Sequence, residues 1–127
     1  MKTKVGLWID HRQAVIVRLT DGVQKTRRIM SDMEKHVRFS GGAETNSAED
    51  QRDRRFAGHL HKYYEKVASS VRDAVSILIL GPGEAKLELK TCLENEAFSG
   101  RVVVIETADK MTDRQIAAKV RQHFGIH

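Results

Sequence analysis

The first thirty residues alternate between hydrophobic and polar positions, as residues do along β-strands. Two apolar runs, residues 5–9 and 14–19, are separated by a polar break, and this pattern predicts a β-hairpin. Asp21-Gly22 is a common hairpin turn, and it precedes a more polar segment, residues 23–30. That polarity predicts a third strand at the edge of the sheet. The chain is therefore expected to begin with three antiparallel strands.

Three later segments place apolar residues at helical spacing. The first, residues 48–72, follows a capping-box pattern that begins at Asn46 or Ser47. The second, residues 84–96, follows a glycine-rich turn, and the third, residues 112–125, begins with another capping box and ends at a glycine. The inward-facing residues are expected to be Phe56, Leu60, Tyr63, Tyr64, Val67 and Val71 in the first helix, Ala85, Leu89, Cys92 and Leu93 in the second, and Ile116, Val120 and Phe124 in the third.

Two further segments, residues 75–80 and 101–107, are almost continuously apolar. Such runs are typical of parallel strands that are buried on both faces, so both are expected in the middle of the sheet and close to each other. The predicted element order is β-β-β-α-β-α-β-α. Hairpin-linked strands followed by helical crossovers specify a mixed β-sheet with helices packed on it, which is an α/β fold.

Composition restricts the class of protein. The chain has 127 residues, 40% of them hydrophobic and 31% charged, which is enough for one globular domain, residues 1–127. Cys92 is the only cysteine, so an intrachain disulfide and a cysteine-based zinc site are excluded, and a reducing cytoplasm is expected. The apolar run near the N-terminus is too short for a signal peptide or a membrane span. No membrane, metal or cofactor is expected.

The net charge of +5 is unevenly distributed. Residues 25–38 contain five Lys or Arg and two acids, and residues 51–72 contain six Lys or Arg and two acids, so these segments carry +3 and +4. Between them lies an acidic segment that has no convincing periodicity around Ser40-Gly41-Gly42. We read residues 31–50 as a long loop, and loops of this length in small domains usually have a function. The basic surplus therefore brackets a glycine-bearing loop.

The chain resembles the central domain of the archaeal and eukaryotic class-1 translation release factors and of Pelota, including its bacterial relatives. The resemblance is carried by the opening hairpin VGLWIDHRQAVIVRL, the segment FSGGAETNSAEDQRDRRFAGHLHKYYEKVA, and the strand-turn-helix VSILILGPGEAKLELKTCLENE with RVVVIETA after it. It spans nearly the whole chain and implies a ribonuclease-H-like fold. In that family a Gly-Gly-Gln loop precedes an Arg-rich helix, as Gly41-Gly42 does here.

The resemblance also implies a function for the loop, with one departure from the family pattern. The family's glycines let the backbone approach the peptidyl-transferase centre closely, and its glutamine positions the water that hydrolyses peptidyl-tRNA. Gly41 and Gly42 match this motif, but Ala43 stands in place of the glutamine. Alanine keeps a backbone N–H that can donate to an oxyanion but has no amide to orient water, so hydrolysis is expected to be weak or absent.

The expected function is therefore that of a translation-associated domain that binds ribosomal RNA or tRNA and the ribosome. Lys and Arg side chains pair with RNA phosphates and release counterions. The candidate RNA-binding residues are Arg27, Arg28, Lys35, Arg38, Arg52, Arg54, Arg55 and Lys62.

Three alternative functions remain open at this point. The chain can be a peptidyl-tRNA ester hydrolase in ribosome rescue, or a protein-interaction adaptor that binds no RNA. It can also be a metal-dependent nuclease, in which Asp10 joins other carboxylates around magnesium ions. The candidate companions of Asp10 are Glu65, Asp73, Glu106 and Asp109. Against these functions, Gly41-Gly42 can be an ordinary loop, and the basic residues can be the solvated face of a helix.

Overall fold

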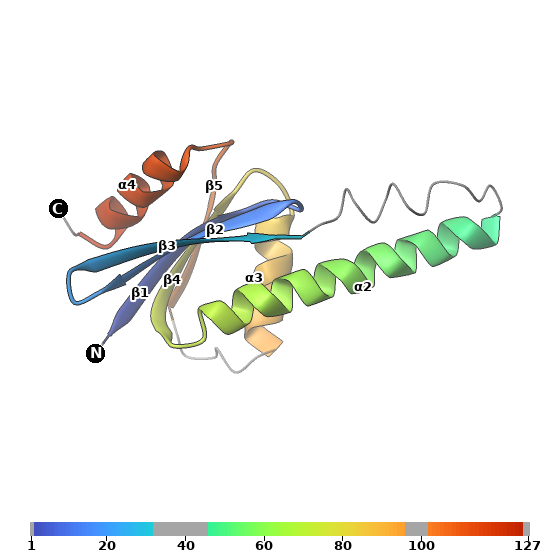
Figure 1. Cartoon of the computed structure of the whole chain (residues 1–127), viewed down its shortest axis with the longest axis horizontal. Coiled ribbons are helices and arrows are strands. Elements are labelled where there is room, and N and C mark those ends of the chain that lie inside the picture. Colours follow the sequence, from blue (N-terminus) through green and yellow to red (C-terminus); the bar gives the residue numbers. More distant parts are fainter. Residues whose placement is uncertain (1, 32–45, 96–101, 126–127) are drawn as a thin grey trace.

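The computed structural model describes residues 2–31, 46–95 and 102–125. Within them, three strands are followed by helices and strands in alternation (Figure 1). The elements are β1 (Thr3–Ile9), β2 (Gln13–Thr20), β3 (Val23–Met30), α2 (Asn46–Ser70), β4 (Ala74–Gly81), α3 (Ala85–Asn95), β5 (Val102–Thr107) and α4 (Asp113–His123). None of the described helices is long and apolar enough to cross a membrane.

The five strands form one mixed sheet in the order β3-β2-β1-β4-β5. The hairpin partners β1 and β2 are antiparallel, as are β2 and β3. Strand β1 also pairs with β4 in parallel, and β4 pairs in parallel with β5. The predicted mixed sheet of an α/β fold is thus confirmed, and β3 lies at an edge as its polarity predicted.

Helices cover both faces of the sheet, and each face has its own hydrophobic core (Figure 1). Helices α2 and α3 pack on one face, where Leu7 and Ile79 meet Val67 and Leu89. Helix α4 packs on the other face. Successive residues of a strand point to opposite faces, so β4 sends Ile77 and Ile79 into the first core and Leu78 and Leu80 into the second. This alternation explains why the segment is continuously apolar.

Strand β5 differs from the sequence-based expectation. It pairs with β4 as predicted, but it forms the second edge of the sheet and is not in its middle. Its residues Val103, Val104 and Ile105 are half-buried, whereas Ile77 to Leu80 of β4 are fully buried. An apolar run shows that both faces of a strand are covered, but it does not show how many neighbouring strands there are. The expectation of two middle strands was therefore wrong for β5.

Helix α4 begins and ends as the sequence predicted. The Thr112 hydroxyl accepts a hydrogen bond from the backbone N–H of Gln115, and the Gln115 side chain accepts one from the N–H of Thr112. This reciprocal pair is a capping box. At the other end, Gly125 has φ +68°, a left-handed conformation that glycine adopts at no steric cost.

Gly6 on β1 allows α4 to approach the sheet closely. A Cβ atom placed on Gly6 would lie 2.2 Å from Val120 Cγ2 and 2.9 Å from Val120 Cβ. Val120 is fully buried, and its branched side chain has no room to withdraw. A glycine at this position in β1 is therefore a packing requirement of the α4 side of the sheet.

We expect Gly6→Ala to destabilise the protein by about 1–3 kcal/mol, the usual cost of overpacking a core. The matched control is Gly58→Ala on α2, where a Cβ meets nothing within 4 Å. Alanine is the better helix former, so the control should stabilise the protein by about 0.5–1 kcal/mol. Urea unfolding of the three proteins measures both effects. Equal stabilities for Gly6→Ala and the wild type would show that α4 does not pack closely on β1.

Candidate functional site

The predicted loop motif lies outside the described residues. Gly41, Gly42 and Ala43 belong to the segment between the end of β3 and the start of α2, as do Lys35 and Arg38. The structure describes the two ends between which this segment runs, Met30-Ser31 and Asn46. Three more candidate residues are part of α2 by their backbone, and their side chains are not among those described: Arg52, Arg54 and Arg55.

The structure places the remaining candidates on two different faces. Along β3, Arg27 shares its face with Ile29, which belongs to the core under α2 and α3. Arg28 points to the opposite face, where its guanidinium donates to Asp113 of α4 at 2.6 Å and to Gln13 at 2.9 Å. Lys62 lies exposed on α2. Arg27 and Lys62 are thus on the same side of the sheet, and Arg28 is not.

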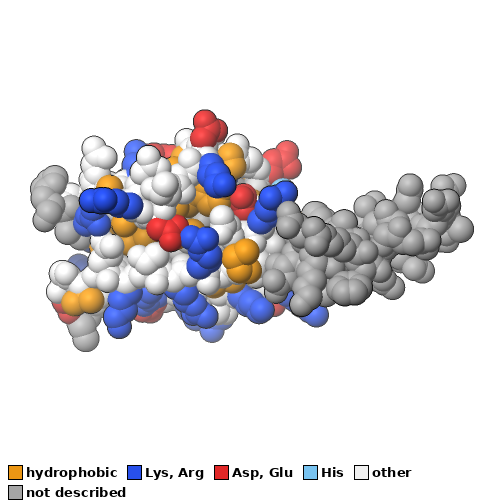
Figure 2. All heavy atoms as spheres, turned by 45° about the horizontal axis from the view of Figure 1, so that its top comes forward, with side chains coloured by type: hydrophobic (Ala, Val, Ile, Leu, Met, Phe, Trp, Pro, Cys, Tyr) orange, Lys and Arg blue, Asp and Glu red, His pale blue; other side chains and the backbone are white. Residues whose placement is uncertain are grey.

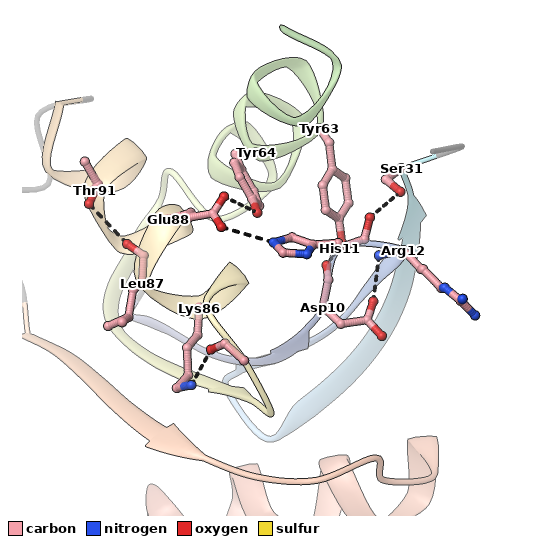
Figure 3. A network of polar contacts seen from close by, with 11 residues as sticks. Asp10, His11, Arg12, Ser31, Tyr63, Tyr64, Lys86, Leu87, Glu88 and Thr91 are labelled. Carbon is pink, nitrogen blue, oxygen red and sulfur yellow. Dashed lines mark hydrogen bonds and ion pairs between the residues drawn. The ribbon is translucent and has the colours of Figure 1, made fainter. Parts of the chain in front are cut away.

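A polar network lies beside the C-terminal end of the central strand β1, where α3 begins (Figure 3). Its centre is Glu88 of α3, whose two carboxylate oxygens have different partners. His11 Nε2 lies 3.0 Å from Glu88 Oε1, and the Tyr64 hydroxyl donates to Oε2 at 3.0 Å. One carboxylate thereby connects the β1–β2 turn to α2 and α3.

A second branch of the network organises the β1–β2 turn. The Asp10 carboxylate accepts hydrogen bonds from the backbone N–H groups of Arg12 and Gln13, each at 2.8 Å. Such a side-chain-to-backbone bond is a common way for aspartate to stabilise a turn. The Tyr63 hydroxyl donates to the carbonyl oxygen of Asp10 at 3.1 Å (Figure 3). Neighbouring tyrosines of α2 therefore contact both the turn and α3.

Ser31 connects this turn to the end of β3 and to α2. Its hydroxyl donates to the carbonyl of His11 at 2.6 Å, and its backbone N–H donates to the carbonyl of Arg12 at 2.9 Å. The Ser31 carbonyl accepts a hydrogen bond from His59 Nε2 of α2 at 2.6 Å. These three hydrogen bonds fix the position of Ser31. It is the last described residue before the segment that contains the glycine motif.

Burial determines the protonation state of the two tyrosines. It is the main cause that raises the pKa of Tyr63 well above its usual value, and the negative charge of Asp10 adds to it. Burial is also the main cause that raises the pKa of Tyr64, followed by the charge and hydrogen bond of Glu88. Both phenols therefore stay protonated and act as hydrogen-bond donors. With these hydrogen bonds the network positions α2 against the β1–β2 turn and α3.

Glu88 was not among the residues predicted from the sequence, although its position in the helix contained a signal for it. Residues 85, 89, 92 and 93 were expected to face inward, and Glu88 falls within the same helical face. A carboxylate on an apolar helix face requires hydrogen-bond donors in the folded protein. The two tyrosines were correctly expected to be buried, but their hydroxyl partners depend on which helices become neighbours.

The carboxylates required by the nuclease alternative do not come together among the described residues. No three Asp, Glu, His or Cys side chains in the described part of the chain are arranged to hold a metal ion. Asp73 adjoins the beginning of β4, at the opposite end of the sheet from Asp10, and pairs with Arg18. Glu65 pairs with His61, and Glu106 pairs with Lys119.

Comparisons with known proteins identify a similar fold. No protein-family model matches the sequence, and no curated protein matches it. Among solved structures, the Pelota protein of Thermoplasma acidophilum aligns over 95% of this chain and 32% of its own, with a TM-score of 0.60 and 15% identity. The archaeal translation termination factor aRF1 aligns over 97% of this chain and 39% of its own, with a TM-score of 0.49 and 12% identity.

A member of the Ppx/GppA family from Aquifex aeolicus aligns over 84% of this chain and 35% of its own, with a TM-score of 0.35 and 13% identity. The likeness to the Pelota protein confirms the expected Pelota-like fold, as a likeness of fold alone. The chain spans about a third of the length of the Pelota protein.

The paired tyrosines predict a specific response to alkaline pH. A folded-state pKa above the unfolded value of 10.0 means that the tyrosines contribute full stability below pH 10 and lose it as the pH rises further. Tyr63 and Tyr64 are the only two tyrosines in the sequence, so the ultraviolet absorbance of phenolate reports on this pair alone. We expect no titration at the usual pKa and ionisation only together with alkaline unfolding.

Glu88→Gln tests the role of the central carboxylate in this response. It removes the negative charge that raises the Tyr64 pKa but leaves the burial, so Tyr64 should titrate at lower pH than in the wild type while staying above its usual value. Tyr64→Phe is the control that assigns the signal. A wild-type titration near pH 10 with the fold intact would show that the phenols are exposed.

Proposed function

We propose that this chain is a translation-associated, RNA- and ribosome-binding domain equivalent to the central domain of Pelota and the class-1 release factors, with a degenerate Gly-Gly-Ala loop. The observation that carries this proposal is the likeness of fold to a Pelota protein over 95% of the chain. The mixed sheet with strand order β3-β2-β1-β4-β5 also supports it, because a ribonuclease-H-like fold is what the resemblance implies. Ribosomes operate in the cytoplasm, so the proposal places the protein there.

The anchoring of α2 supports the same function. Its second half, from Leu60 to Ala68, packs into the core, and its N-terminal turns extend past the edge of the sheet (Figure 1). A helix of 25 residues is about 37 Å long at 1.5 Å per residue, longer than any strand here. The network around Glu88 and Ser31 also holds the second half in place, through His59, Tyr63 and Tyr64. The N-terminal half of the helix, to which Arg52, Arg54 and Arg55 belong, extends away from the core.

RNA binding is tested first by its dependence on salt. If these arginines contact phosphates, the affinity for a single-stranded RNA should fall with salt with a log–log slope of about −0.7 per phosphate contact. Replacing Arg52, Arg54 and Arg55 by alanine should flatten the slope by up to about 2. Co-sedimentation with ribosomes and filter binding to RNA measure the effect. Absence of wild-type binding at low salt would favour the adaptor function.

The loop motif is tested by a release assay on ribosomes with bound peptidyl-tRNA. Wild-type hydrolysis should be weak or absent, because Ala43 has no side chain to position water. Ala43→Gln should raise the hydrolysis rate, and Gly42→Ala in that background should remove the gain by restricting the backbone. Strong wild-type hydrolysis would favour the ester hydrolase. No gain from Ala43→Gln in a protein that binds ribosomes would show that the loop does not reach the ester.

A further inference from the structure

Both sides of the sheet carry paired and unpaired basic side chains. On the α4 side, Arg28 pairs with Asp113, Lys119 pairs with Glu106 at 3.1 Å, and Arg121 donates to Gln24. Lys110 and Arg114 on that side make no ion pair or hydrogen bond within the described residues. On the α2 face, four exposed cations make no ion pair or hydrogen bond within the described part of the chain. These four, here called the β3–α2 basic strip, are Lys25, Arg27, Lys62 and Lys66.

The geometry of β3 and α2 brings these four residues to one side. Lys25 and Arg27 point to the same face of β3 as Ile29, whose side chain packs in the α2 core. The flank of α2 beside this face is marked by two contacts. His59 donates to Ser31 at the end of β3, and the Ser70 carbonyl accepts from Arg18, whose Cα neighbour on β3 is Lys25.

Lys66 lies on the same flank of α2 as His59 and Ser70, because residues three, four and seven apart share one side of a helix. Lys62 is next to both His59 and Lys66 at spacings of three and four, and leans further toward solvent. Lys25 and Arg27 are about 6.6 Å apart along the strand, and Lys62 and Lys66 are about 6 Å apart along the helix. The strip thus consists of two short rows of cations, one on β3 and one on α2. Figure 2 shows Lys and Arg side chains both on the face turned toward the viewer and along the lower edge of the molecule.

The strip has a direction. Near the β2–β3 turn it ends at a hollow of about 520 Å³ that is lined by Asp21 and Asp73 as well as by Arg18 and Lys25. Toward the other end, no ion pair or hydrogen bond joins the strip to an acidic side chain within residues 2–31, 46–95 and 102–125. The excess positive charge therefore lies in the part of the strip that Arg27, Lys62 and Lys66 form.

The chemistry of the strip fits a phosphate backbone. Like charges held side by side repel and cost stability, and a bound polyanion removes that cost while releasing counterions. Lys and Arg side chains pair with phosphate oxygens, and contacts to phosphate carry no information on base sequence.

We propose that the β3–α2 basic strip binds the sugar–phosphate backbone of RNA independently of base sequence. This inference rests on the proposed function and adds a surface to it. It brings in Lys25 and Lys66, which lie in the two basic segments but were not among the candidate RNA-binding residues, and it excludes Arg28.

The test replaces all four strip residues by glutamine and measures binding to single-stranded RNA of mixed sequence over a range of salt. If each strip residue neutralises one phosphate, the log–log slope should flatten by up to about 2.8. The matched control replaces Arg28, Lys110, Lys119 and Arg121 by glutamine. It removes the same number of charges from the α4 side of the sheet and from the segment between β5 and α4. The control should keep the wild-type slope. Circular dichroism and thermal unfolding verify that both variants fold.

The possible outcomes distinguish this proposal from the broader one. One outcome is that the wild type binds RNA, the strip variant keeps the wild-type salt slope, and the slope flattens only in the Arg52, Arg54 and Arg55 variant. The strip proposal is then wrong, and the proposed function stands. If the wild type binds no RNA at low salt, the proposed function itself fails. If polyglutamate competes as well as RNA, the strip is a site for any polyanion and the RNA assignment is overturned. Equal affinity for RNAs of different sequence would support it.

Discussion

Strand β1 is the constraint on which the rest of the structure depends. It is the only described strand with an antiparallel neighbour on one side and a parallel neighbour on the other, so it joins the hairpin half of the sheet to the half built with helical crossovers. Its side chains enter both cores, Leu7 under α2 and α3 and Trp8 under α4. Gly6 provides the space that Val120 of α4 occupies. Both helical layers are therefore placed relative to one strand.

The end of β1 is also where polar contacts take over from hydrophobic packing. The backbone must turn after Ile9, and a turn at the end of a buried strand leaves polar groups that need partners. Asp10 satisfies two N–H groups of the turn, and Tyr63 satisfies a carbonyl. Glu88 then connects the turn to both neighbouring helices through His11 and Tyr64. Helix α2 is therefore held against the sheet by polar contacts as well as by apolar packing.

The folded structure determines where the positive charge of the protein lies, which the net charge does not show. A net charge of +5 is compatible with many surfaces. In the folded chain, ion pairs and hydrogen bonds engage several cations on the α4 side, whereas Lys25, Arg27, Lys62 and Lys66 stay free within the described residues. The proposed RNA surface is consequently a product of strand alternation and helix docking. In the same proposal the protein binds RNA but hydrolyses peptidyl-tRNA weakly or not at all. Ala43 keeps a backbone N–H but has no side-chain amide that could position water.

The sequence by itself determined the elements of this protein, because periodicity and capping are local. The alternation in residues 5–19, the apolar run that became Ile77 to Leu80, and the capping box at Thr112 all predicted elements that the structure confirms. Only the tertiary structure decided which elements are neighbours. It placed β5 at an edge, put Arg27 and Arg28 on opposite faces, and brought Glu88 to Tyr64 and His11. These outcomes depend on contacts between residues distant in sequence, and local patterns carry no information on which distant partners meet.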